Sequence, residues 1–384
     1  PGEEAPGLPF GKEGLEGGDG HGAYSSPMEL LRPEATVLSL GRRVLSFDRE
    51  GRPYHYFREG KTYKRALDGG LHLRYREGER RRRRLAPEEA LGVYQEVLDL
   101  AEAHLRDERR REEVLRWTPE GLLDPTPYRR AYAWPVSILP PDAYLSVVLQ
   151  ATTGCTWNRC AFCSFYQDRP FQKRTPEAFR EHIQAVLALL GRGRLLRRGV
   201  FLADGNALAL SEPLLPLLEL VRAHFPGEPV MGFLDLFTGL KKAPSWWERL
   251  GGMGLRRVYI GLETGHAPLL ALLRKPGHPK EVLPLVRALK AAGLSVGVIL
   301  MVGAGGKAFA EAHFRESLAL LAELPLGRGD VVYLSPFRED PGTPYAALGL
   351  APLEDLEGEL QRWAQAVRRL GLRASRYEIR EFLY

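Results

Sequence analysis

Residues 154–166 read GCTWNRCAFCSFY, and this stretch holds Cys155, Cys160 and Cys163, the only cysteines among the 384 residues of the chain. Cysteines that serve as small core residues scatter along a sequence, so three within nine positions indicate a set of ligands. A closed structural zinc site needs four ligands, and the nearest downstream histidine, His182, falls inside a predicted helix. Three thiolates suit a four-iron cluster better, because they leave one iron open to a substrate or cosubstrate.

This stretch resembles the cluster loop of the radical S-adenosylmethionine (SAM) superfamily, in which three cysteines hold a [4Fe–4S] cluster. The resemblance implies that SAM binds the fourth iron, and that its reductive cleavage gives a 5′-deoxyadenosyl radical that abstracts hydrogen from a substrate. It also implies an external low-potential electron donor of the flavodoxin or ferredoxin type, and it places Phe162 beside the adenine of SAM. The spacing here is C-x4-C-x2-C, one residue longer than the common C-x3-C-x2-C of the family.

Strand and helix signals alternate regularly beyond residue 143. Uninterrupted apolar runs predict six buried parallel strands, near Leu145–Leu149, Gly199–Ala203, Val230–Leu236, Val258–Leu262, Val296–Val302 and Val331–Leu334. Amphipathic or Leu/Ala-rich stretches predict helices between them, including Pro176–Leu190, Pro213–His224, Pro279–Ala292 and Lys307–Leu324. Six βα units predict an α/β fold, a partial (βα)6 barrel of the TIM type, over residues 143–346.

Polar motifs follow several predicted strands, at the barrel end where such folds carry their chemistry. Asp204, Gly205 and Asn206 end the second strand and resemble the Gly-Gly-Glu motif that binds the amino group of SAM in the superfamily. Residues 261–265 read GLETG and resemble the G-x-E-S-G stretch of the methylthiotransferases and the cobalamin-associated members. We expect Glu263 to bind a hydroxyl or ammonium group of the cosubstrate, because a buried carboxylate needs a partner. Capping of the next helix is the alternative.

Three further strand ends add weaker signals. Gly303 follows the fifth strand and allows close approach of a flat ligand such as adenine. Ser335 ends the sixth strand, shortly before a PGTP stretch at 341–344 that resembles the end of the radical SAM core. Asp235, after the third strand, is either structural or faces the substrate, and Lys275 stands where the related proteins have a lysine. The predicted SAM-binding residues are Phe162, Asp204, Gly205, Asn206, Glu263, Gly303 and Ser335.

The rest of the chain divides by composition. Residues 1–27 are rich in Gly, Glu and Pro and predict a flexible leader. Residues 28–117 predict a small antiparallel β module, five consecutive arginines at 80–84 and a helix from Pro87 to about Arg111. Residues 118–142 hold six prolines and predict a linker, and residues 347–384 predict a helix over Leu353–Leu370 and a tail.

Composition excludes some classes of protein and leaves others open. The net charge is +6, and only ten of the 54 basic residues are lysine, which is typical of a GC-rich genome and weakens any argument for nucleic acid. No apolar run approaches the ~18 residues of a membrane span. Few, clustered cysteines favour a reducing cytoplasm. No cysteine remains to ligate a second cluster, and the D-x-H-x-x-G pattern typical of cobalamin binding does not appear in residues 28–135.

Two alternatives stay open at this point. The first keeps a radical SAM enzyme but makes its substrate RNA, with Arg80–Arg84 and the N-terminal module as the docking surface; we favour a solvated edge that faces the acidic start of the following helix. The second is a zinc-binding nucleic-acid or scaffold protein that uses the cysteines structurally.

Overall fold

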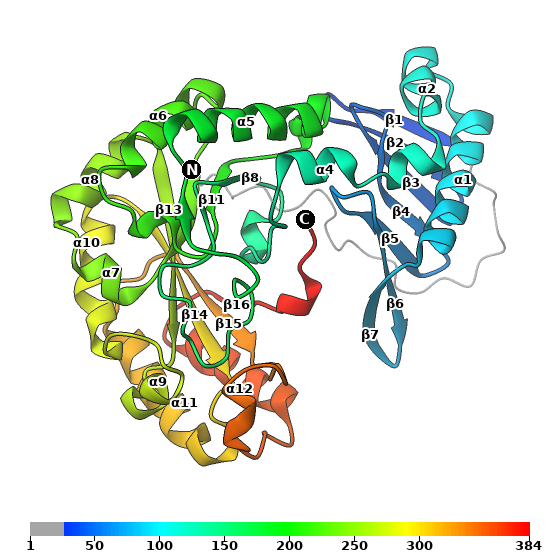
Figure 1. Cartoon of the computed structure of the whole chain (residues 1–384). Helices are drawn as coiled ribbons and strands as arrows, with labels where there is room; N and C mark the ends of the chain where they lie inside the picture. The colour runs from blue at the N-terminus through cyan, green and yellow to red at the C-terminus, as the bar shows by residue number, and fades with distance from the viewer. Residues whose placement is uncertain (1–26) are drawn as a thin grey trace.

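The computed structural model describes residues 27–384, so the predicted leader lies outside the described residues except for Pro27. Two large sheets build the protein, one antiparallel in the N-terminal part and one parallel in the remainder (Figure 1). Helices cover the outside of the parallel sheet, which curves into a partial barrel, and two further helices cover one face of the antiparallel sheet. This arrangement confirms the predicted α/β partial barrel with an N-terminal β-plus-helix part.

Seven parallel strands form the barrel sheet: β8 (Val147–Gln150), β11 (Val200–Ala203), β12 (Val230–Leu234), β13 (Leu255–Glu263), β14 (Ser295–Val302), β15 (Val331–Pro336) and β16 (Ala374–Arg376). Their order across the sheet is β16-β15-β14-β13-β12-β11-β8. The six predicted strands are all present, with bounds that differ by a few residues. The sequence does not predict β16, because this strand has only three residues and no apolar run. The strand depends on its pairing with β15, where Val332 lies opposite Ala374.

The outer helices are α5 (Pro176–Leu190), α6 (Leu214–His224), α7 (Leu236–Leu240), α8 (Pro244–Gly252), α9 (Ala267–Leu272), α10 (Val282–Ala291), α11 (Gly306–Glu323) and α12 (Leu356–Arg369). Helix α5 shows why they form where predicted. The hydroxyl of Thr175 accepts a hydrogen bond from the backbone of Ala178 at 3.2 Å, Pro176 occupies the first turn, and Phe179, Ile183 and Val186 are buried on one face.

The antiparallel sheet contains β1 (Met28–Leu31), β2 (Ala35–Leu40), β3 (Arg43–Asp48), β4 (Pro53–Arg58), β5 (Lys61–Arg65), β6 (Leu71–Glu77) and β7 (Glu79–Arg84), paired in chain order. It extends beyond the predicted module at both ends, because the arginine run pairs with β6 as a strand. The predicted helix is two helices, α1 (Pro87–His104) and α2 (Glu108–Leu115), since Leu105 is extended and Asp107 caps α2.

The predicted proline-rich linker packs against the barrel. It contains the short helices α3 (Pro119–Leu123) and α4 (Thr126–Ala131). Tyr128, Tyr132 and Leu139 belong to the apolar core of the barrel. The hydroxyl of Tyr132 donates a hydrogen bond to the carbonyl of Val148 in β8 at 2.7 Å. Residues 118–142 therefore lie along the edge strand of the barrel.

A buried ion pair joins the N-terminal sheet to the barrel. Arg52 and Asp48 are both buried, and Nε of Arg52 donates to Oδ2 of Asp48 at 2.8 Å. The same guanidinium donates to the carbonyls of Leu189 and Leu190 at 2.7 and 2.6 Å, where α5 ends. Carbonyls at the end of a helix lack partners within it, so Arg52 satisfies these two while it balances Asp48.

We expect Arg52→Met to lower the free energy of unfolding by about 3–5 kcal/mol, because it leaves a buried carboxylate without its partner. Urea unfolding followed by circular dichroism measures this loss. Arg42→Met is the control, since Arg42 is exposed and makes no ion pair within residues 27–384. Equal stability of the two variants would contradict the role given to Arg52.

Candidate functional site

The cysteine loop leaves the barrel after β8 and is held at both of its ends. Strands β9 (Thr152–Thr153) and β10 (Gln172–Lys173) pair antiparallel, with Thr153 opposite Gln172. Gly154 has a φ of +74°, and a Cβ there would lie 3.0 Å from the carbonyl of Pro170, so the returning chain leaves room only for glycine. Residues 154–171 are therefore closed into one loop over the end of β8.

Cys155, Cys160 and Cys163 are free thiols and partly buried. The backbone of Cys163 donates to the carbonyl of Cys160 at 3.3 Å. Burial, aided by the neighbouring thiols, raises the pKa of Cys160 to about 12 and that of Cys163 to about 11. Over residues 27–384 no three Cys, His, Asp or Glu side chains are gathered tightly enough to hold an ion. The donor set still fits an iron–sulfur cluster, because it offers three unpaired thiols from one loop and no fourth protein ligand.

The other side of the loop is tied to the segment after β13. The backbone N–H of Ala161 donates to the carbonyl of Leu273 at 2.8 Å, and the indole of Trp157 donates to the carbonyl of Arg274 at 2.9 Å. Tyr345, in turn, donates its backbone N–H to the carbonyl of Ala161 at 2.9 Å. These bonds hold the cysteines beside the ends of β13 and β14.

Asp204, predicted to bind SAM, holds the start of the loop. Its Oδ2 accepts the backbone N–H of Gly154 at 2.8 Å and lies 3.4 Å from Arg169, while its Oδ1 accepts the amide of Gln150 at 3.1 Å. Burial raises the pKa of this carboxyl. Gly205 lies under the ring of Tyr166, where a Cβ would come within 2.6 Å of it. The direct SAM-binding role of both residues stays a prediction.

Asn206 and Asp235 form a second contact between the loop and the strand ends. The amide nitrogen of Asn206 donates to the hydroxyl of Thr156 at 2.8 Å and also to the carboxylate of Asp235. Asp235 accepts the backbone N–H of Thr238 at 2.7 Å as the N-cap of α7. Of the two roles expected for Asp235, the structural one is therefore present.

Glu263 is buried at the end of β13, and its carboxylate pairs with the ammonium of Lys275. Burial disfavours the charged form of Lys275, but Glu263 and the thiol of Cys160 outweigh it, so the pKa of this lysine is raised. Glu263 has a φ of +64°, a costly conformation for a residue with a side chain and one that clusters at functional sites. Gly261 leaves space for the pair, because a Cβ there would lie 2.6 Å from Nζ of Lys275.

The residue after Glu263 begins a buried polar network that joins three elements. The hydroxyl of Thr264 lies 2.7 Å from Nδ1 of His313 on α11, and Nε2 of His313 lies 2.8 Å from the carbonyl of Met301. Ser317 accepts the backbone N–H of Gly265 at 2.8 Å. The GLETG stretch is thus fixed against α11 and β14.

Phe162, Gly303 and Ser335 lie on the side of the site formed by β14 and β15. Phe162 packs on the apolar cluster that contains Ala161, Met301 and Ala304. Gly303 has a φ of +92°, and a Cβ there would lie 2.8 Å from Leu356 at the start of α12. Ser335 is buried and lies opposite Met301 in the sheet register.

The sequence does not single out Gln150 and Arg169. Gln150 is a polar residue at the end of an apolar strand, and this could have marked it. Its amide nitrogen also donates to the carbonyl of Trp134 at 3.0 Å, whereas its buried amide oxygen has no partner among the described residues. Arg169 gives no sequence signal, yet its buried guanidinium contacts Asp204, Asp168 and the carbonyl of Pro135.

His182 does not contribute to the cysteine site. Its Nε2 accepts the backbone N–H of Gln150 at 2.9 Å, and its Nδ1 lies 2.9 Å from the carbonyl of Ala131. Burial lowers the pKa of this imidazole to about 3. Both ring nitrogens are therefore used to join α5 to β8 and α4, and neither is free for a metal.

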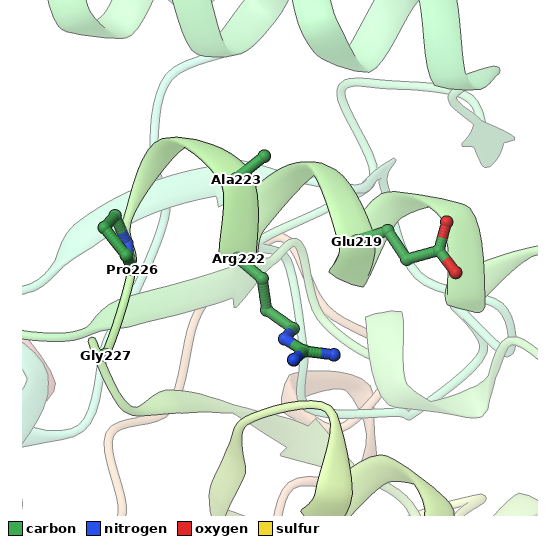
Figure 2. A pocket seen from close by; sticks show the side chains of 5 residues that line it. All are labelled: Glu219, Arg222, Ala223, Pro226 and Gly227. Carbon is green, nitrogen blue, oxygen red and sulfur yellow. The ribbon is translucent and has the colours of Figure 1, made fainter.

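A shallow depression of about 370 Å³ lies on the outer surface at the end of α6 (Figure 2). Glu219, Arg222, Ala223, Pro226 and Gly227 line it. It contains none of the residues predicted for the site, and it lies outside the strand ends.

Comparison with known proteins identifies the barrel. Residues 149–318 match the family model of the radical SAM superfamily. Residues 149–318 therefore form a radical SAM domain. A domain of this family implies a [4Fe–4S] cluster and SAM as cofactors, and enzymes of the family generally need a reductant. No curated protein matches the chain in sequence.

Several solved radical SAM structures resemble it at low identity. The methylornithine synthase PylB is 18% identical, with a TM-score of 0.44 over 74% of this chain and 75% of its own. Coproporphyrinogen III oxidase (HemN) from Escherichia coli is 16% identical, with a TM-score of 0.47 over 59% and 52%. The cobalamin-dependent enzyme OxsB is 16% identical, with a TM-score of 0.39 over 57%, and this chain spans only 31% of it. Within residues 27–384, no helix is both long and apolar enough for a transmembrane segment.

We expect Gly261→Ala to destabilise this radical SAM enzyme by about 1–3 kcal/mol, because the new methyl group would push Lys275 and Glu263 apart in a packed interior. Thermal or urea unfolding measures the loss. Gly252→Ala is the control, since a Cβ at Gly252 would meet no atom within 4 Å. A stable Gly261→Ala variant would show that the pair tolerates displacement.

The histidine that joins α5 to β8 should make stability depend on pH. The pKa of His182 falls from 6.5 in the unfolded chain to about 3 in the fold. Below pH 6.5 only the unfolded chain binds this proton, so stability decreases as pH falls, by about 1.4 kcal/mol per pH unit from this group. His182→Gln should remove that part of the slope between pH 6.5 and 4, as measured by urea unfolding. An unchanged slope would contradict it.

Proposed function

We propose that Cys155, Cys160 and Cys163 hold a [4Fe–4S] cluster at the end of the barrel, and that the protein abstracts a hydrogen atom from a carbon of an unidentified substrate. One observation carries the proposal. The loop with all three thiols is bonded to two separate segments, through Asp204 at the end of β11 and through the carbonyls of Leu273 and Arg274 at the end of α9. Such a loop holds its ligands beside two sets of predicted SAM-binding residues, those that follow β11 (Asp204, Gly205 and Asn206) and Glu263 at the end of β13.

When bound, the cluster and SAM supply a one-electron cleavage that gives methionine and a 5′-deoxyadenosyl radical. The protein's own part is to bind, orient and exclude water. Phe162, packed on Met301 and Ala304, offers an apolar surface for adenine. The carboxylate of Glu263 pairs with Lys275, and it can accept a hydrogen bond from a hydroxyl or ammonium group of SAM. Asp204 acts chiefly by positioning the loop.

The barrel interior below these residues favours a reaction away from water. Phe201, Phe233, Tyr259 and Tyr333 make a chain of ring contacts across β11, β12, β13 and β15, with centroids 5.1 to 6.3 Å apart. Aromatic side chains pack densely and leave little space for solvent. A reactive carbon radical needs this protection, because water and other side chains would otherwise quench it.

Neither alternative gains an observation of its own. A zinc protein would need a fourth ligand, and His182 has both nitrogens occupied. An RNA-docking arginine run would need unpaired cations, yet Arg81, Arg83 and Arg84 pair with Glu77, Glu89 and Asp68. The pair of Arg83 with Glu89 agrees with the predicted solvated edge beside the acidic start of α1.

The test is cluster content and SAM cleavage under anaerobic conditions. Reconstituted protein should bind about four iron and four sulfide per chain, and under a low-potential reductant it should convert SAM to 5′-deoxyadenosine. Cys160→Ala should lose both while its far-ultraviolet circular dichroism stays unchanged, whereas Glu263→Ala should keep the iron and bind SAM more weakly. Tightly bound zinc without iron, or cluster-loaded protein that forms no 5′-deoxyadenosine, would overturn the proposal.

A further inference from the structure

We propose that Tyr377 is a substrate-binding residue, and that its hydroxyl, inside the barrel, forms a hydrogen bond to the polar head of a small organic substrate. This head carries an N–H or O–H donor together with an acceptor, as a carboxamide does. The proposal rests on the proposed function, because it concerns the substrate of the same site. It deepens that function by naming the chemical class of the substrate and a residue outside the matched stretch 149–318.

The segment after β16 closes the open side of the barrel. Strands β16 and β8 are the two edges of the sheet, and residues 377–384, in red, run from the first toward the second (Figure 1). The hydroxyl of Tyr384 accepts the backbone N–H of Val148 in β8 at 2.9 Å. The ring of Phe382 packs against that of Tyr144, just before β8, with centroids 5.9 Å apart. This closure favours a small molecule over a polynucleotide as the substrate.

The sheet register directs the side chain of Tyr377 into the barrel. Arg376 lies opposite Leu334 in the pairing of β16 with β15, and the backbone N–H of Tyr377 donates to the carbonyl of Leu334 at 3.0 Å. Arg376 points outward, where it binds the exposed Glu357 of α12 at 2.7 Å. Successive side chains of a strand point to opposite faces, so Tyr377 points inward. Its ring lies 5.6 Å from that of Tyr333, one of the aromatic side chains of the interior.

The hydroxyl of Tyr377 is buried and unused. The residue is only 3% exposed, and its hydroxyl has no hydrogen-bond partner in the described part of the chain. A buried hydroxyl without a partner is costly. Tyr384 of the same segment shows the usual arrangement, because its hydroxyl accepts from Val148 and donates to the carbonyl of Ser146 at 3.3 Å. The unused group therefore indicates a partner that arrives with a ligand.

A second unused group faces the interior from the other edge of the sheet. Gln150 lies opposite Ala203 in the register of β8 with β11. Phe201, two residues before Ala203, is one of the interior rings, so Gln150 faces the interior as well. The amide oxygen of Gln150, which lacks a partner among the described residues, can only accept a hydrogen bond. A substrate group beside it must therefore donate, whereas the hydroxyl of Tyr377 can donate or accept.

The surroundings of Tyr377 keep its hydroxyl neutral and relate it to the predicted SAM site. Burial raises the pKa of Tyr377 well above its usual range, and the neighbouring Tyr166 and Glu263 are among the groups that add to the rise. The ring of Tyr166 covers Gly205, and Glu263 ends β13. The hydroxyl is thus within electrostatic reach of two residues of the site, and it keeps the proton that it would donate to a substrate.

The test compares Tyr377→Phe with Tyr384→Phe, which removes the same atom from the same segment. Cluster-loaded proteins are held anaerobically with SAM and without reductant. Acetamide and benzamide are the probes, since each carries a carboxamide, and saturation-transfer NMR titrations give their dissociation constants. We expect the wild type to bind at least one of these amides. Tyr377→Phe should bind it about tenfold more weakly, because the hydrogen bond to the hydroxyl is lost, and Tyr384→Phe should match the wild type.

Urea unfolding supplies a readout that needs no ligand. Tyr377→Phe should keep or raise the midpoint, because the hydroxyl that it removes makes no hydrogen bond in the ligand-free protein. Tyr384→Phe should lower the midpoint, because it leaves the N–H of Val148 without its acceptor. A lower midpoint for Tyr377→Phe would show that its hydroxyl has a structural partner, and this result would overturn the proposal.

The amide titrations can overturn it in two further ways, by equal affinity of the wild type and Tyr377→Phe or by no binding of either amide. Weaker SAM binding by Tyr377→Phe, with amide binding unchanged, would assign the hydroxyl to SAM instead. Faster formation of 5′-deoxyadenosine when RNA is added, to the same extent in the wild type and Tyr377→Phe, would replace the small molecule by a polynucleotide. A wild type that binds no iron would refute the proposed function, and this result is distinct from all of these.

Discussion

Seven strands run parallel in the barrel, and every loop that leaves a strand's C-terminal end therefore meets the others at one edge. The site depends on this constraint. It brings the loop after β8 beside Asp204 from β11 and beside Glu263 from β13, although these residues lie far apart in the sequence. In a sheet of mixed direction these side chains would be divided between two edges. The cysteine loop, whose start is held by Asp204, would then lie away from Glu263.

Two buried carboxylates at this edge are each matched by a cation from another segment. Asp204 meets Arg169 from the end of the cysteine loop, and Glu263 meets Lys275 from the segment after α9. An unpaired buried charge would cost several kcal/mol, so each loop must adopt the conformation that supplies its cation. The pairs add little net stability in return for that cost. Their effect is specificity, because they fix where the loops lie before any cofactor binds.

In the N-terminal sheet, the charged side chains pair mainly with residues of the same part of the chain. Arginines dominate its last strand, yet carboxylates of the same part of the chain neutralise Arg81, Arg83 and Arg84. Its firm contact with the barrel is the buried Arg52, which binds the carbonyl groups at the end of α5. Arg159, by contrast, lies between two of the cysteines and is exposed. A run of arginines in a sequence is thus a weaker guide to a charged surface than the partners that the fold gives each residue.

The sequence by itself determined the class of fold and the chemistry of the donor set. Buried parallel strands read as apolar runs, so six of the seven were predictable, whereas β16 exists only because β15 offers an open edge to three residues. Three clustered cysteines identified the loop without any structure. Tertiary structure alone decided what the nearby polar residues do. Periodicity shows that a side chain lies at a strand end. Hydrogen bonds between distant segments decide that Asp204 binds the backbone of Gly154 and that His182 joins α5 to β8. They also fix the stretch between the first two cysteines, where Asn158 and Trp157 donate to the carbonyls of Tyr166 and Arg274, which no local pattern predicts.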